Sequence, residues 1–115
     1  MTTTSVLNVD RNQLLQTWQS TLPDMLKEGD SCQIELDAVH PDRLHITIDM
    51  AGRTQYSFDF HCTYLDEREV KVDLVDVQQG HDAIDERSEH IQHFVKEYIR
   101  HIHECAQGVQ HLTHA

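Results

Sequence analysis

The chain has 115 residues, and its 9 Lys and Arg against 20 Asp and Glu give a formal net charge of −11 with the 10 His neutral. Such a charge repels nucleic-acid phosphates and anionic membrane surfaces, so neither is expected as a partner. A basic or amphipathic protein partner fits the charge instead. The length suits one domain, so we expect residues 1–115 to form a single unit with a flexible N-terminus over residues 1–9.

The N-terminal segment and the cysteines bear on location and metal chemistry. The first ten residues, MTTTSVLNVD, contain no positive region followed by an apolar one, which predicts no signal peptide and a cytoplasmic location. Cys32, Cys62 and Cys105 are widely spaced and include no CxxC pair. This spacing argues against a disulfide framework and a structural zinc site, and we expect small buried side chains at these positions.

The first predicted element is a helix that begins after Asp10, because aspartate is a favourable N-cap. Apolar side chains follow at helical spacing: Leu14, Leu15, Trp18, Leu22, Met25 and Leu26. Pro23 is expected to kink or restart this helix, since proline lacks the backbone N–H. Gly29 suits the position just past its end.

The apolar period then changes from 3.6 to 2 residues. Four segments alternate apolar with polar side chains, at residues 31–39, 43–50, 54–64 and 69–77. Their short connections make consecutive strands antiparallel neighbours. We therefore predict a four-stranded meander with one apolar and one polar face.

A long C-terminal helix is predicted from about residue 82 to residue 112, with Asp82 as its N-cap and Asp85 and Glu86 in its first turn. Its apolar residues include two heptad-spaced rows, Val95, Ile102 and Val109, and Ile91, Tyr98, Cys105 and Leu112. Both helices need an apolar surface to pack on, and the sheet offers one. The predicted fold is an α+β two-layer sandwich, in the order helix, four-stranded antiparallel meander, long helix, with both helices on one face.

The predicted length of the last helix indicates a dimer. At 1.5 Å per residue it would span ~45 Å, whereas a strand of seven or eight residues spans only ~25 Å. Its apolar stripe nevertheless continues to its end, and a second copy of the chain would cover the overhang. We expect a homodimer whose interface contains Tyr98, Ile102, Cys105, Val109 and Leu112.

A stripe of histidine and glutamate borders the apolar face of that helix. By the helical repeat it contains Glu86, His90, His93, Glu97, His101 and Glu104. Imidazole and carboxylate side chains bind zinc, so His93, Glu97 and His101 are candidate metal ligands. One helix supplies only two or three ligands to one ion, however, and HExxH is absent. The favoured interpretation is an exposed face with weak i,i+4 interactions.

The polar face of the sheet provides a second candidate surface. Its residues are Asp37, His45, Asp59, His61 and Asp73. The predicted pairing sets Asp37 and Asp59 on either side of His45, and Arg43 and Asp73 on either side of His61. A histidine between two carboxylates should have a raised pKa. An open sheet face is not a dry pocket, and no phosphate loop or serine nucleophile motif accompanies it, so a partner-binding surface is preferred to a catalytic site.

These observations predict a small, acidic, cytoplasmic, homodimeric interaction module without catalytic activity or cofactor. The alternatives are a metal- or pH-responsive protein that uses the helix stripe or the sheet histidines, and an enzyme whose pocket forms only between two copies. The size, acidity, mixed order of elements and expected dimer resemble bacterial secretion chaperones at the level of class alone. Those chaperones usually interrupt their strands with a helix that this sequence lacks, and no motif or residue carries over.

Overall fold

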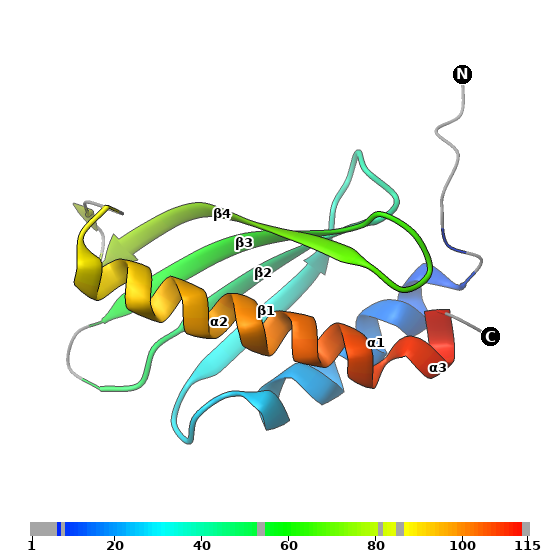
Figure 1. The fold of residues 1–115 in the computed structure, drawn as a ribbon, viewed down its shortest axis with the longest axis horizontal. Coiled ribbons are helices and arrows are strands. Elements are labelled where there is room, and N and C mark those ends of the chain that lie inside the picture. The colour runs from blue at the N-terminus through cyan, green and yellow to red at the C-terminus, as the bar shows by residue number, and fades with distance from the viewer. Residues whose placement is uncertain (1–6, 8, 53–54, 81, 85–86, 114–115) are drawn as a thin grey trace.

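The computed structural model describes residues 7, 9–52, 55–80, 82–84 and 87–113. The elements along the chain are helix α1 (Arg11–Thr21), the 3-10 helix η1 (Leu22–Met25), strands β1 (Ser31–Leu36), β2 (Arg43–Asp49), β3 (Tyr56–Tyr64), β4 (Val70–Gln79) and β5 (Asp82–Ala83), and helices α2 (Glu89–Gly108) and α3 (Gln110–Thr113). The strands form one antiparallel sheet in sequence order (Figure 1). The predicted α+β fold with its four-stranded meander is confirmed, and the two-residue strand β5 is an addition.

The N-terminal helix begins and ends where the sequence indicates. The Asp10 carboxylate accepts hydrogen bonds from the backbone N–H groups of Asn12 and Gln13, so Asp10 is the N-cap of α1. The helix ends at Thr21, and Pro23 lies in the first turn of the tighter helix η1. The chain then turns through Gly29, whose φ of 91° favours glycine.

One face of the sheet forms the core. Ile34 of β1 is opposite Ile46 of β2, and Ile46 is opposite Phe60 of β3. All three side chains are buried, whereas the side chains between them along each strand remain at least partly exposed. Helices α1 and α2 therefore cover the same face of the sheet.

A β-bulge in β4 corrects the strict alternation expected for that strand. The register shifts between Asp59 and Phe60, which pair with Asp76 and Leu74, so Val75 is an extra residue. Because of the bulge, Leu74 and Val77 both face the core although they are three residues apart. Val75 is left 46% exposed.

The second helix starts later than predicted. Asp82 pairs with Gln79 in β5 after a turn through Gly80, whose φ is 63°, so it is not the N-cap. The N-cap is Ser88, whose hydroxyl accepts a hydrogen bond from the Ile91 N–H. Asp85 and Glu86 lie outside the described residues. Helix α2 has 20 residues, and it therefore spans only ~30 Å.

The residues predicted for a dimer interface belong to the core of the single chain. Tyr98, Ile102, Cys105 and Val109 are at most 5% exposed, and Leu112 packs against the core. The shorter helix has no apolar overhang, because the sheet, α1 and η1 cover its stripe. That reason for expecting a dimer is wrong, and a homodimer needs a different interface.

Two of the three cysteines are buried as predicted, and the third is partly exposed. Cys62 and Cys105 are fully buried free thiols, and burial raises the pKa of Cys105 to about 12. Cys32 is partly exposed.

At the N-terminus, Leu7 is buried and Val9 packs against the core, so the packed part of the chain begins before residue 10.

A buried hydrogen bond joins the two layers. The indole Nε1 of Trp18 in α1 donates to the Tyr64 hydroxyl at the end of β3, at 3.1 Å, and both side chains are at most 3% exposed. The rings meet edge to face, with centroids 6.5 Å apart.

We expect Tyr64→Phe to destabilise the fold by about 1–3 kcal/mol, because it leaves the buried Trp18 N–H without an acceptor. Urea denaturation measures the loss. Tyr56→Phe, at a partly exposed tyrosine, is the matched control and should change stability by less than about 0.5 kcal/mol. Equal losses in the two variants would contradict a specific role for the Trp18–Tyr64 bond.

Candidate functional site

The face of the sheet away from the helices carries the candidate surface. We call it the polar face, and its side chains are Ser31, Gln33, Glu35, Arg43, His45, Thr47, Asp49, Ser57, Asp59, His61, Thr63, Lys71, Asp73, Asp76 and Gln78. Carboxylates outnumber Arg and Lys among these residues. The described helices pack on the opposite side, so this acidic surface faces solvent.

The observed register assembles a different row from the one predicted. Glu35 is opposite His45, His45 is opposite His61, and His61 is opposite Asp73. Only the pairing of His61 with Asp73 matches the prediction. A shift of two residues keeps every side chain on the same face, so alternation alone could not identify the correct register.

Asp37 lies beyond the end of β1 and has a structural contact of its own. Its carboxylate accepts hydrogen bonds from the N–H groups of Val39 and His40, at 2.8 and 2.9 Å. These bonds, that of His40 first, lower the pKa of Asp37. Asp37 therefore shapes the β1–β2 turn and does not belong to the row of His45.

His45 contacts both a carboxylate and a second histidine. Asp59 is opposite Thr47 and accepts a 2.7 Å hydrogen bond from the Thr47 hydroxyl. The same Asp59 oxygen lies 3.7 Å from His45 Nε2, diagonally across the strands. The imidazoles of His45 and His61 meet edge to face, with centroids 5.3 Å apart. The described residues thus place two histidines and a carboxylate in mutual contact, with His45 Nε2 shielded from solvent and without a hydrogen-bond partner among them.

The pKa of His61 is lowered from its ordinary value of 6.5. Partial burial contributes most, and the positive charges of Arg43 and His45 add to it. Asp37 and Asp73 act in the other direction but do not outweigh these effects. His61 therefore favours its neutral form.

The histidine–glutamate stripe on α2 does not come together as a ligand cluster. His93 Nε2 lies 3.9 Å from Glu97, but Lys27 Nζ lies closer to that carboxylate, at 3.3 Å. His101 Nδ1 instead contacts Glu104, at 2.9 Å. Partial burial alone would raise the pKa of Glu97. The contact with Lys27 and a smaller contribution from His93 together outweigh the effect of burial, so the pKa of Glu97 is lowered. The Glu97 carboxylate is thus paired with the Lys27 ammonium, which would compete with a metal ion for it.

A small cavity of about 220 Å³ adjoins this stripe, between α2 and the turns that precede β1 and follow β2. At its wall the Tyr98 hydroxyl donates to Asp30 at 3.2 Å, and the other Asp30 oxygen accepts from the Ala51 N–H. These contacts join residues far apart in the sequence, so no local sequence pattern predicted them. They fix the Gly29 turn against α2.

Within the described part of the chain, no group of three or more His, Cys, Asp and Glu residues is arranged to hold a metal ion. None of its helices has both the length and the apolar character needed to cross a bilayer. No family model, curated protein or solved structure matches the chain.

We expect His61 to titrate below 6.5 in an NMR pH titration of its ring protons. Between the folded pKa and 6.5 the unfolded chain then binds more protons, so the contribution of His61 to stability is lost as the pH falls below about 6.5. Arg43→Gln should raise the pKa of His61 because it removes a nearby positive charge. Arg100→Gln on α2 is the control and should leave it unchanged. A wild-type His61 pKa above 6.5 would contradict this account.

Proposed function

We propose that the protein is a small, cytoplasmic, homodimeric interaction module without catalytic activity, and that its polar face binds a basic segment of a protein partner. The main support is the position of the acidic residues. Glu35, Asp59, Asp73 and Asp76 lie on one nearly continuous sheet surface opposite the helices. A surface of one dominant sign raises the association rate of partners of opposite sign.

The cross-strand acid pair supports the sign of the proposed partner. Asp59 and Asp76 are directly opposite each other on β3 and β4, which is unfavourable for two negative charges. Among the described residues, the Thr47 hydroxyl donates to Asp59 and the Gln78 amide donates to Asp76. A lysine or arginine of a partner would relieve the remaining repulsion between them.

A pH-dependent form of this binding is the second candidate. The contact between His45 and His61 favours it, because protonation of both would place two positive charges 5.3 Å apart at the centre of the acidic surface. Acidic pH would then weaken the attraction for a basic segment. The metal-responsive alternative has the weaker support, since Lys27 already neutralises Glu97.

The proposal is tested by titrating a ten-residue Lys/Arg peptide into labelled protein at low salt and following backbone amide shifts. We expect the shifts to map to β2, β3 and β4, and the affinity to fall with added salt. The double variant Asp73→Asn/Asp76→Asn should bind roughly tenfold more weakly.

The matched control removes two charges from the helical side, in Asp24→Asn/Glu28→Gln, where both side chains are exposed. It should bind the peptide with nearly wild-type affinity. Equal weakening by both double variants would show that only net charge matters and would contradict a site on the polar face. Shifts confined to α2 would contradict it as well.

A further inference from the structure

Strand β1 is the terminal strand of the sheet and has an outer edge. The Asp37 N–H donates to the Arg43 carbonyl, so odd-numbered residues of β1 direct their backbone groups toward β2. The N–H and C=O groups of Cys32, Ile34 and Leu36 therefore point away from the sheet. Such an edge is a template for a further strand.

The opposite edge of the sheet is protected, whereas the edge of β1 is not. Strand β4 has a bulge at Val75, carries Lys71 and Asp73, and pairs with β5 at its end. Bulges, charges and short covering strands are the usual means of preventing edge-to-edge pairing. In β1 the only charged residue is Glu35, and there is no proline or lysine.

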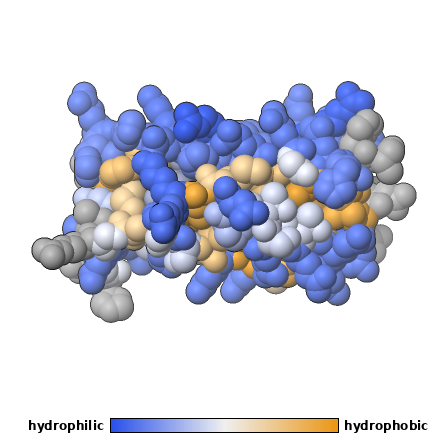
Figure 2. Space-filling model, turned by 90° about the horizontal axis from the view of Figure 1, so that it is seen from below, coloured by the Kyte–Doolittle hydropathy of each residue, from blue (hydrophilic) through white to orange (hydrophobic). Residues whose placement is uncertain are grey.

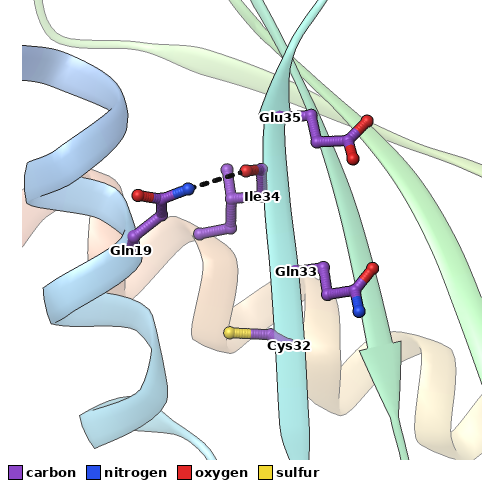
Figure 3. A pocket seen from close by; sticks show the side chains of 5 residues that line it. All are labelled: Gln19, Cys32, Gln33, Ile34 and Glu35. Carbon is purple, nitrogen blue, oxygen red and sulfur yellow. Dashed lines mark hydrogen bonds between the residues drawn. The ribbon is translucent and has the colours of Figure 1, made fainter. Parts of the chain in front are cut away.

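A groove of about 580 Å³ runs along this edge, lined by Gln19, Cys32, Gln33, Ile34 and Glu35. Cys32 and Ile34 point toward α1, and Gln33 and Glu35 point to the other side of the strand (Figure 3). The Gln19 amide donates to the Ile34 carbonyl at 3.0 Å. Because Gln19 is exposed, its amide can return to water, and it is a weak cover for that carbonyl.

Apolar surface adjoins the edge. Seen from below Figure 1, on the side where α1, η1 and β1 lie, a band of hydrophobic surface runs between hydrophilic borders (Figure 2). Leu15 of α1, Leu26 directly after η1, and Cys32 and Leu36 of β1 are only partly buried. A strand added at β1 would extend the sheet beside this band.

The sequence of β1 is complementary to itself in an antiparallel register centred on its fourth residue, Ile34. With a two-fold axis at Ile34, Gln33 lies opposite Glu35 of the second copy, so an amide faces a carboxylate, and Cys32 lies opposite Leu36. An axis at Glu35 would oppose two Glu35 carboxylates, and an axis at Leu36 would oppose Glu35 and Asp37. Both of these registers are unfavourable because like charges lie directly opposite each other.

We propose that a second copy of the chain pairs with the outer edge of β1, antiparallel and centred on Ile34, and that this pairing forms the homodimer. The inference rests on the homodimeric part of the proposed function and is independent of the polar-face partner. The Ile34 N–H of each copy replaces Gln19 as donor to the Ile34 carbonyl of the other. In this register the Ile34–Ile34 pair and the two Cys32–Leu36 pairs exchange both of their backbone hydrogen bonds, and the two sheets become one.

Sedimentation equilibrium with three variants tests the register. Gln33→Glu would place a glutamate opposite Glu35 of the other copy at two symmetric positions, and we expect roughly tenfold weaker dimerisation. The double variant Gln33→Glu/Glu35→Gln exchanges the pair and should restore wild-type affinity. Gln107→Glu adds the same charge at an exposed position of α2 and is the control for net charge, with little expected effect. Circular dichroism verifies the fold of each variant, since all three positions are exposed.

Each outcome decides a different point. Weakening by Gln33→Glu with recovery in the double variant supports the pairing. Weakening without recovery would overturn the register centred on Ile34. A dimer that none of the variants affects would overturn the β1 interface and leave the homodimer in place. A wild-type monomer at the highest soluble concentration would overturn this inference and the homodimer together, while the peptide titration would still decide the polar-face proposal.

Discussion

The apolar face of the sheet can be buried only if helices of the same chain reach it, and this requirement determines the rest of the structure. Helices α1 and α2 and the turn η1 all pack on that one face, with the Trp18–Tyr64 bond between the layers. The chain of 115 residues has no further long helix among its described residues with which to cover the second face. The second face must therefore be polar, and its acidic residues define the surface that the protein presents.

The same one-sided arrangement sets the electrostatics of the polar face. His45 and His61 lie side by side in the middle of the sheet, where each is partly shielded from water by its neighbours. For His61, burial and the positive charge of Arg43 outweigh the nearby carboxylates. A neutral His61 leaves the carboxylates near it uncompensated, in line with the proposed basic partner.

Hydrophobic periodicity was sufficient to identify the fold, because a half-buried strand and an amphipathic helix have different periods. It correctly assigned the four long strands, the Asp10 cap and the break at Pro23. It failed for the start of α2, because Asp82 and Ser88 are both acceptable caps and the turn at Gly80 gave the competing strand β5. It also missed the bulge at Val75, since strict alternation offers no sign of an extra residue.

The candidate surfaces were less predictable than the fold. Alternation places His45 and His61 on the polar face but does not distinguish registers that differ by two residues. The Lys27–Glu97 and Tyr98–Asp30 contacts depend on how η1 and α2 meet, so a helical wheel of α2 alone could not show them. The prediction that His93, Glu97 and His101 bind a metal ion was therefore made without knowledge of these contacts.

Amide hydrogen exchange at Ile34 tests the central claim most directly, namely that covering one face leaves the edge of β1 as the surface where two copies meet. The Ile34 N–H points away from β2, whereas those of Gln33 and Glu35 point toward it. We predict that Ile34 exchanges quickly in dilute protein and becomes protected as the concentration rises, while Gln33 and Glu35 stay protected throughout. Exchange at Ile34 that does not change with concentration, in a sample that dimerises, would contradict the account.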